Sequence, residues 1–424
     1  MKRYDAYKFT GIPWIPEVPE HWEERRAKNL FVRMEREVQE EDEVVTCFRD
    51  GQVTLRKNRR TEGFTESFKE IGYQGIRKGD LVIHQMDAFA GAIGISDSDG
   101  KGTPVYICLQ PKQGCMNEYY ALVIREMARA GYIKAQYKGI RERSSDFRYE
   151  TFAGLFLPLP PLSEQRAIVA YIERKERQID TYIARQAEQI ERLKELRQTI
   201  ISHAVTRGIH PYTRFRPTGI PWIPEVPKHW EVRMLSQLAK EHYKSNKDVH
   251  NQNLLSLSYG RIINKDINRQ TGLTPASYDT YQIVENGNIV LRLTDLQNDQ
   301  RSLRVGLCTQ EGIITSAYLA LEARESMHRP FLYLLLHVTD LMKVFYCMGN
   351  GLRQNLNWGE LRKLLCILPP LSEQRAIVAY IEKKTATVDR MINACREQTE
   401  LMKAYKQRLI SDAVTGRINV LPHD

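Results

Sequence analysis

The sequence predicts a mixed α/β protein made of two tandem domains, each followed by one long helix. Three observations lead to this fold class. The chain has 424 residues, which is long for a single domain. Two long motifs occur twice at almost the same separation, and two stretches run for more than forty residues without proline or glycine. We expect the two helices to pair as an antiparallel coiled coil with pseudo-twofold symmetry.

The internal repeat is the strongest of these signals. LPPLSEQRAIVAYIE, at 159–173, recurs unchanged at 368–382, 209 residues later. TGIPWIPEVPEHWE, at 10–23, recurs with one substitution at 218–231, 208 residues later. Such a separation far exceeds a solenoid repeat, so each copy is a domain-sized unit produced by tandem duplication.

The two copies differ in length at one place. Gly79 and the residues after it align with Gly287 at a separation of 208, whereas Gly94 aligns with Gly306 at 212. The second copy therefore carries about four extra residues within 295–305. Loops that differ between otherwise similar domains are the expected place for a difference in recognition.

Each copy begins with a region of mixed strand and helix patterns. Runs that are rich in β-branched residues and bounded by Gly, Asn or Asp predict strands at 80–84, 105–109, 288–292 and 317–321. Helices are predicted at 119–130 and 331–344. The resulting boundaries are a first α/β head at 1–157, a helix at 158–208, a second head at 209–367 and a second helix at 368–424.

The long helices have start and stop signals. A proline pair precedes each one, and Ser163 and Ser372 lie where N-caps belong. Gly208 and Gly416 follow as stops. A helix of about 44 residues is roughly 66 Å long.

Each long helix has an apolar stripe with a mean spacing near 3.5 residues, the coiled-coil period. The stripes are Ile172, Ile179, Ile183, Ile190, Leu193, Ile200 and Ala204, and Ile381, Val388, Ile392, Thr399, Met402, Leu409 and Ala413. Each stripe could pack on its own domain, but the rod is longer than such a domain, which favours pairing between the helices. Simple connectivity favours the antiparallel direction and a dumbbell with two heads.

Composition narrows the class of protein. Hydrophobic residues make up 42% and charged residues 27%, typical of a soluble globular chain, and the net charge of +10 favours a polyanionic partner. Seven cysteines without a CxxC pair indicate reduced thiols in the cytoplasm. We expect neither a membrane span nor a secretion signal, because no apolar run is long enough and the N-terminus lacks an apolar core.

The motifs of several enzyme classes are missing from the sequence. It has no [ND]-P-P-[YF] loop, no GxxxxGK[ST] phosphate loop and no HExxH or CxxC metal set. The glycine-rich run at 89–94 is interpreted as a turn, and His21, His84 and His229 as structural or surface residues. We therefore expect no catalytic residue and no metal site.

The identical polar residues of the second motif predict a docking surface that occurs twice. Internal packing would require similar size and polarity, but not identity at positions expected to be exposed. The alternative is a recent duplication, which the diverged heads argue against. The predicted partner-docking residues are Glu164, Gln165, Arg166, Glu173, Glu373, Gln374, Arg375 and Glu382.

The chain is basic and has two variable halves, each of which ends in PPLxEQxxI and a long helix. With both motifs doubled, it resembles the specificity subunit of a Type I DNA restriction-modification system. The resemblance covers essentially the whole chain. It implies that the heads are target recognition domains, each reading half of a split site on double-stranded DNA. It also implies that the helices separate the heads and bind two methyltransferase subunits, which restriction/translocase subunits then join.

The resemblance further implies a non-catalytic chain without a cofactor of its own. S-adenosylmethionine, ATP and Mg are expected only on the partner subunits. Two other classes stay open: a stand-alone DNA-binding regulator, and a methyltransferase or nuclease in its own right. The doubled docking motif argues against the first, and the missing motifs argue against the second.

Three regions are candidates for contact with DNA: the basic segments 54–60 and 261–269, the turns at 139–141 and 351–355, and the segment whose length differs, 87–93 against 295–305. Lys and Arg would hold phosphates, whereas Asn, Gln or Arg could read base edges. A solvated charged face or a structural turn is the alternative for each. The candidate residues are Arg56, Lys57, Asn58, Arg59, Arg60, Arg141, Arg261, Lys265, Asn268, Arg269, Arg353, Gln354 and Asn355.

Overall fold

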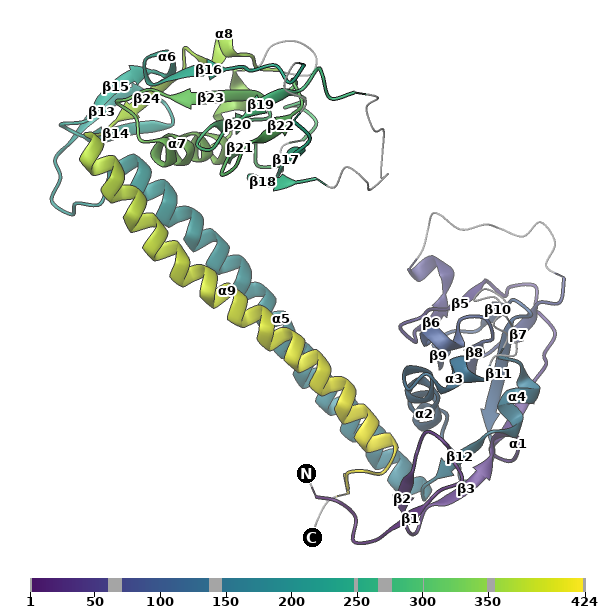
Figure 1. The fold of residues 1–424 in the computed structure, drawn as a ribbon. Coiled ribbons are helices and arrows are strands. Elements are labelled where there is room, and N and C mark those ends of the chain that lie inside the picture. Colours follow the sequence, from purple (N-terminus) through teal and green to yellow (C-terminus); the bar gives the residue numbers. More distant parts are fainter. Residues whose placement is uncertain are drawn as a thin grey trace. The chain divides into compact units, whose positions relative to one another are not determined.

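The computed structural model describes residues 2–59, 71–136, 147–247, 251–265, 277–299, 301–348 and 355–421. It divides into two compact units. Unit 1 comprises Met1–Gln186 and Glu397–Asp424, and unit 2 comprises Ala187–Arg396. Each unit therefore contains one α/β head and half of each of two long helices, α5 and α9 (Figure 1).

The head of unit 1 is built on an antiparallel four-stranded sheet in the order β4-β11-β8-β9. Its strands and the helix beside it are β4 (Phe31–Met34), β11 (Tyr106–Pro111), β8 (Leu81–His84), β9 (Ile93–Ile95) and α2 (Asn117–Arg129). Leu81 and Ile83 share a core with α2, while the intervening Val82 packs with a separate apolar cluster that includes Val45 and Val53. This alternation places a core on each face of the sheet.

Four two-stranded sheets and several short helices surround this sheet. The strand pairs are β1 (Tyr7–Phe9) with β2 (Glu17–Pro19), β3 (Glu23–Arg26) with β12 (Phe156–Leu159), β5 (Val45–Cys47) with β6 (Val53–Leu55), and β7 (Gln74–Ile76) with β10 (Gly100–Gly102). The short helices are α1 (Ala27–Leu30), η1 (Arg56–Asn58), η2 (Ala88–Ala90), α3 (Tyr132–Ala135) and α4 (Tyr149–Gly154).

The head of unit 2 repeats this topology, with a four-stranded sheet in the order β16-β23-β20-β21. Its elements are β16 (Ala239–His242), β23 (Leu319–Ala323), β20 (Ile289–Leu291), β21 (Val305–Leu307) and α7 (Arg329–Leu341). The strand pairs are β13 (Phe215–Ile220) with β14 (Ile223–Pro227), β15 (Glu231–Met234) with β24 (Leu365–Leu368), β17 (Leu255–Ser258) with β18 (Arg261–Asn264), and β19 (Gln282–Val284) with β22 (Gly312–Ile314). The short helices are α6 (Leu235–Leu238), η3 (Val344–Cys347) and α8 (Trp358–Leu361).

Every sheet of one head has a counterpart in the other, as the repeat predicts. The predicted strands correspond to β8, β11, β20 and β23, and the predicted helices to α2 and α7. The predicted length difference lies in the connection between β20 and β21. The equivalent connection in unit 1, between β8 and β9, is shorter and forms η2.

The long helices are α5 (Leu162–Arg207) and α9 (Leu371–Val414). The prediction that Ser163 and Ser372 cap them is wrong, because both helices begin one residue earlier. The Pro161 carbonyl accepts the Glu164 and Gln165 amides at 2.9 and 3.0 Å and so closes the first turn of α5 without a side-chain cap. The predicted stop at Gly208 is confirmed, with φ of 76° beyond the last turn.

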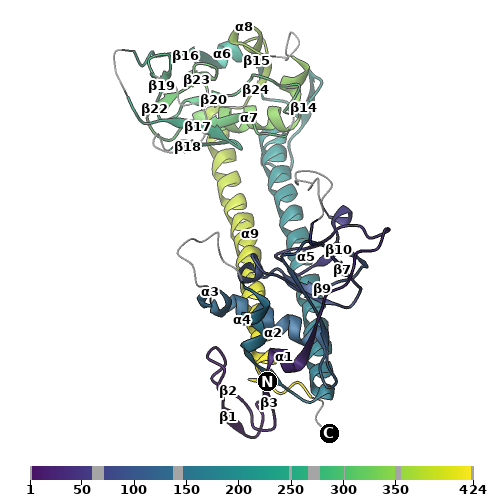
Figure 2. The ribbon, with the colours of Figure 1, turned by 90° about the vertical axis from the view of Figure 1, so that its right-hand side faces the viewer.

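The two long helices pack against each other in opposite directions, which confirms the predicted antiparallel pairing (Figures 1 and 2). In unit 1 the first half of α5 lies along the last half of α9, where Lys406 Nζ is 3.0 Å from Asp180. In unit 2 the last half of α5 lies along the first half of α9, where Arg197 Nε is 3.0 Å from Asp389. The predicted stripe residues are buried or partly buried along this seam.

Two further findings concern the class of protein. None of the helices that the structure describes has both the length and the apolar character needed to cross a bilayer. All seven cysteines carry free thiols, and burial raises the pKa of the Cys47, Cys108 and Cys366 thiols to about 12. These three thiols stay protonated at neutral pH and are poor nucleophiles.

Candidate DNA-binding and partner-binding sites

The two doubled motifs meet at the start of each long helix. In unit 1 the Trp22 side chain is fully buried beside the first turn of α5. Glu164 of that turn lies 2.8 Å from His21 Nε2 and also accepts the Tyr4 hydroxyl. The end of α9 closes the same corner, since a Cβ on Gly416 would lie 2.9 Å from the Trp22 ring. A carboxylate here also faces the positive end of the α5 dipole.

Unit 2 repeats the histidine–glutamate contact of this corner, with the Trp230 indole in place of the tyrosine hydroxyl. Glu373 lies 2.8 Å from His229 Nε2 and accepts the Trp230 indole N–H at 3.1 Å. The end of α5 closes the corner, because a Cβ on Gly208 would lie 3.2 Å from both Trp230 and Glu373. Each head is thus joined to the start of one long helix and to the end of the other.

The glutamine after each of these glutamates holds a head loop against the helix. Gln165 Nε2 donates to the Gly114 and Pro160 carbonyls at 2.9 Å, and its Oε1 accepts the Met116 amide at 3.0 Å. Gln374 forms the same three bonds, to Ser326 at 3.1 Å, Pro369 at 2.8 Å and His328 at 2.8 Å. A buried amide with all these bonds satisfied fixes its neighbours in one geometry.

The sequence analysis placed these residues on an exposed docking surface, and their exposure is corrected here. Glu164 is 2% exposed, and Gln165 and Gln374 are 0% exposed. Glu373 is also largely buried, with 11% of its side chain accessible. The two glutamates bond to the repeated head motif, whereas the two glutamines bond to the backbone of a head loop and of the preceding proline. Sequence reasoning missed this because the bonds join residues that are far apart in the chain.

Four of the predicted docking residues are exposed, as expected. They are Arg166, Glu173, Arg375 and Glu382. Glu173 forms a long ion pair with Arg177, at 3.8 Å. These four residues occupy equivalent positions on α5 and α9, so an identical exposed charge pattern occurs twice.

The first basic segment follows β6 and forms η1. Asn58 donates to Thr54 Oγ1 at 2.8 Å, and Lys57 forms an ion pair with Glu43. Arg59 lies 2.7 Å from Asp50, with its guanidinium 4.2 Å from the centre of the Phe48 ring. Arg56 begins the turn and is partly buried. The segment is basic, but its charges are partly balanced by neighbouring carboxylates.

The second basic segment begins with β18, the second strand of the equivalent hairpin of unit 2. Arg261 opens β18, and Lys265 follows it with its amide bonded to the Leu254 carbonyl at 2.8 Å. Both side chains are exposed, as is Tyr259 in the hairpin turn, at 79%. The first basic segment therefore continues from β6, whereas the second begins within the equivalent strand β18.

Asn355 is described, and its Oδ1 accepts the Asp295 amide at 2.8 Å. This bond gives Asn355 a structural contact within unit 2. The remaining DNA-contact candidates lie outside the described residues: Arg60, Arg141, Asn268, Arg269, Arg353 and Gln354.

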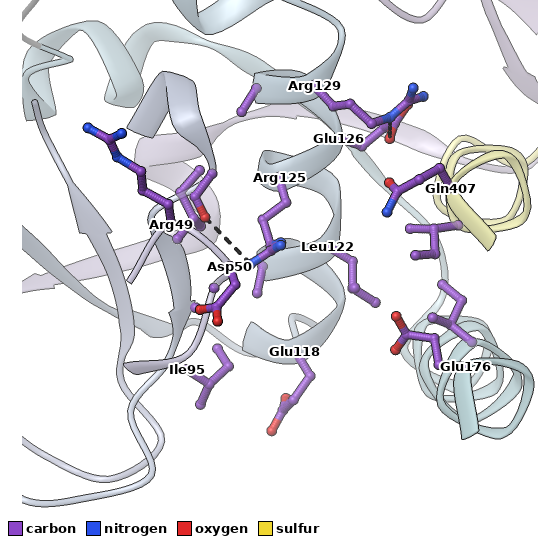
Figure 3. Close-up of a pocket in the computed structure, with 18 of the residues that line it drawn as sticks. Arg49, Asp50, Ile95, Glu118, Leu122, Arg125, Glu126, Arg129, Glu176 and Gln407 are labelled. Atoms are coloured by element: carbon purple, nitrogen blue, oxygen red, sulfur yellow. Dashed lines mark hydrogen bonds and ion pairs between the residues drawn. The ribbon is translucent and has the colours of Figure 1, made fainter. Parts of the chain in front are cut away.

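Unit 1 also contains a cavity of about 630 Å³ between α2, the segment 49–51 and the two long helices. Figure 3 shows Arg125 reaching from α2 toward the segment that carries Asp50, with Glu176 and Gln407 on the long helices facing α2. Burial lowers the pKa of Arg125, and its guanidinium contacts the Gly91 carbonyl at 3.5 Å. Charges of both signs line this cavity, so it has no clear preference for a polyanion. Within the described ranges no three His, Cys, Asp or Glu side chains gather as a metal site.

Sequence reasoning missed one residue of unit 2. Arg304 is 0% exposed and donates to backbone carbonyls of the loop that precedes it. From the sequence, a single arginine in a polar stretch is predicted to be exposed on the surface. One feature of the sequence could have indicated its importance: Arg304 lies at the end of the segment that is longer in the second copy.

Two heads of one topology, each joined to a long helix that pairs with the other helix, show a duplicated architecture. No family model matches the chain. It is 23% identical over 436 residues to the putative type I restriction enzyme MjaX specificity subunit of Methanocaldococcus jannaschii, with 96% of each chain covered. It is 22% identical over 380 residues to the type I restriction enzyme MjaVIII specificity subunit of the same organism, covering 85% of this chain and 84% of that one.

Two solved structures share the fold. A chain from "Structural basis underlying complex assembly and conformational transition of the type I R-M system" superposes with a TM-score of 0.65 at 16% identity, covering 94% of this chain and 98% of that chain. The HsdS subunit from Thermoanaerobacter tengcongensis superposes with a TM-score of 0.55 at 17% identity, covering 95% and 98%. The resemblance predicted from the doubled motifs is thus confirmed: the curated homologues are type I restriction enzyme specificity subunits.

Proposed function

We propose that this chain is the non-catalytic specificity subunit of a type I restriction-modification complex in the cytoplasm. The observation that carries the proposal is the match with the putative MjaX specificity subunit over 96% of both chains. The duplicated head supports it, because a protein that reads a split site needs two readers. Double-stranded DNA is the proposed ligand, in keeping with the net charge of +10.

The two heads are proposed to read different half-sites. Their sheets correspond one to one, so the same surface of each head can face DNA. The connection between β20 and β21 differs in length from its counterpart, so the side chains presented there differ too. An asymmetric split site follows from two related but non-identical readers.

The long helices are proposed to bind two methyltransferase subunits. Arg166 and Glu173 on α5 repeat as Arg375 and Glu382 on α9, and all four are exposed. Identical surfaces that occur twice suit two copies of one partner. Restriction/translocase subunits would join that complex, and S-adenosylmethionine, ATP and Mg would bind to the partner subunits.

Co-expression with the methyltransferase subunit of the same locus tests the proposal. We expect size-exclusion chromatography with mass determination to give one copy of this chain with two methyltransferase subunits, and the complex to methylate DNA at one split motif. A chain that binds specific DNA but no methyltransferase would instead be a stand-alone regulator. A chain that binds neither would refute the proposal.

A further inference from the structure

The connection from β20 to β21 in unit 2 is organised by one buried arginine. Arg304 lies at its end, immediately before β21, and its side chain is 0% exposed. The aligned residue of the first head is Ala92, which lies immediately before β9. The buried arginine therefore occurs in the second head and not in the first, within the segment where the heads differ in length.

The Arg304 guanidinium binds the loop 292–299 through its backbone. Nη1 donates to the Thr294 carbonyl at 2.9 Å and to the Arg292 carbonyl at 3.4 Å. Nη2 donates to the Asp295 carbonyl at 3.4 Å and to the Asp299 carbonyl. The planar fork of one side chain thus reaches four carbonyls spread over eight residues. A lysine ammonium donates from a single point and cannot span this set.

The buried charge is balanced within unit 2. Asp299 Oδ2 lies 3.7 Å from Arg304 Nη2, and hydrogen bonds from Ser302 lower the pKa of Asp299 to about 2, so this carboxylate stays ionised. Asp340 on α7 accepts the Arg304 amide at 2.6 Å. The Tyr346 ring lies 5.9 Å from the guanidinium. In some proteins a buried charge of this kind fixes a single conformation.

The other side of the loop carries amide side chains. Gln297 and Asn298 are exposed, and Asn298 Nδ2 donates to Asp295 Oδ1 at 2.7 Å. Asp295, two residues before Gln297, adopts a left-handed φ of 56°, a conformation that Asp tolerates better than most residues. Asn and Gln are the side chains that pair with adenine through two hydrogen bonds in the major groove.

We propose that Arg304 is a positioning residue for DNA specificity, which holds the loop 292–299 so that Gln297 and Asn298 read bases in the half-site of the second head. The inference rests on the proposed function and extends it to one loop and one buried side chain. Arg304 touches no DNA itself in this account. A loop fixed before binding has little conformational entropy left to lose, which favours discrimination between bases.

The test is selection of binding sites from random DNA by the complex with methyltransferase subunits, using wild type, Arg304→Met, Arg304→Lys and Leu238→Ala. Leu238 is buried in the same head but on α6, so Leu238→Ala lowers stability without removing any bond to the loop. We expect both Arg304 variants to lose roughly tenfold or more discrimination in one of the two blocks. The other block, read by the unchanged head, should be selected as in wild type, and Leu238→Ala should select both.

Arg304 variants that select both wild-type blocks would overturn the inference. If neither variant is soluble, the double variant Gln297→Ala/Asn298→Ala removes only exposed side chains, and its selection of both wild-type blocks would overturn the inference equally. A wild-type complex that selects no split site would refute the proposed function instead, so the two failures are distinguishable.

Discussion

At the scale of single residues, each doubled motif contains side chains of two kinds. Glu164 and Gln165 are buried and hold a head against its helix, whereas Arg166, one residue further on, is exposed. Identity between the copies could not separate these roles. Burial of Glu164 depends on Tyr4 and His21, which lie more than 140 residues away in the chain. The repeated motif therefore could not show from the sequence which of its residues face solvent.

This division makes opposite predictions for adjacent positions. Glu164→Ala with Glu373→Ala leaves buried donors without an acceptor, which costs about 1–3 kcal/mol at each corner. Arg166→Glu with Arg375→Glu changes only exposed charges, so stability should stay within about 0.5 kcal/mol of wild type. The exposed pair should instead weaken co-purification of methyltransferase subunits. Urea unfolding and quantitative pull-down measure the two effects.

The outcome is informative in either direction. Full recruitment of two methyltransferase subunits by Arg166→Glu/Arg375→Glu would remove these positions from the docking surface. A wild-type unfolding midpoint for Glu164→Ala/Glu373→Ala would contradict the clamping role of the buried glutamates.

A buried histidine makes the stability of unit 2 depend on pH. Burial, reinforced by Arg197, lowers the pKa of His337 from 6.5 to about 4. The unfolded chain therefore takes up a proton between these values while the folded chain does not, so stability is lost as pH falls from 6.5 toward 4. The effect is roughly 3 kcal/mol at most. His337→Phe retains the stacking on Tyr333 and should lose less stability than wild type on acidification.

Thermal melting of both proteins at several pH values between about 4.5 and 7 checks this prediction, since this interval covers most of the proton uptake. Equal losses in wild type and His337→Phe would exclude His337 as the cause. A larger loss in the variant would contradict the sign of the effect.

At the scale of elements, the sequence predicted the long helices almost completely. Helix α5 is free of proline and glycine, and Gly208 ends it in a left-handed turn. Its start was misplaced, because residues 158–159 belong to strand β12 and the Pro161 carbonyl rather than the Ser163 hydroxyl accepts the first amides. Backbone carbonyls are available at every residue, so no sequence pattern indicates which one will serve.

The heads were less predictable than the helices. The longest strand in either four-stranded sheet has six residues, and short apolar runs of this kind give weak signals. The repeat compensated for this, because a strand found in one copy indicates its counterpart. The loop between β20 and β21 was located by its length difference, but its conformation depends on a buried Arg304 that the sequence did not distinguish.

The basic segment after β6 provides a prediction for this scale. Replacing Arg56, Lys57, Arg59 and Arg60 by Ala should weaken DNA binding and flatten its dependence on salt. For every phosphate that the variant no longer neutralises, the slope of log affinity against log salt should become shallower by about 0.9. Titrations at several salt concentrations measure the slope, and an unchanged slope would place the segment away from DNA.

The acidic partners supply the matched control for this experiment. Glu43 forms an ion pair with Lys57, and Asp50 one with Arg59. Glu43→Ala with Asp50→Ala leaves both cations in place and removes repulsion toward phosphate. Binding by this control should therefore be unchanged or tighter, opposite in sign to the basic variant.

At the scale of the whole molecule, we expect the length of the helix pair to set the distance between the two half-sites on DNA. Half-site centres about one helical turn apart, roughly 10 base pairs, would place both blocks on one face of the duplex. Four residues inserted after Arg192, matched by four after Ile392 on the antiparallel partner, should lengthen the pair by about 6 Å and rotate it by about 40°. The preferred gap should then shift, or binding should be lost, with both block sequences unchanged.

Site selection with wild type and the paired insertion side by side measures the gap. An insertion that leaves the gap unchanged would show that the helices do not set it. An insertion that rewrites the blocks themselves would mean that the heads do not read them independently.

The central claim is that this chain alone determines which DNA sequence its complex methylates. The most direct measurement is a map of methylated adenines in the host genome before and after deletion of the gene, with complementation by the wild-type gene. The account predicts that one split, asymmetric motif loses methylation at all its occurrences and regains it on complementation. An unchanged map, or loss at a continuous or palindromic motif, would contradict it.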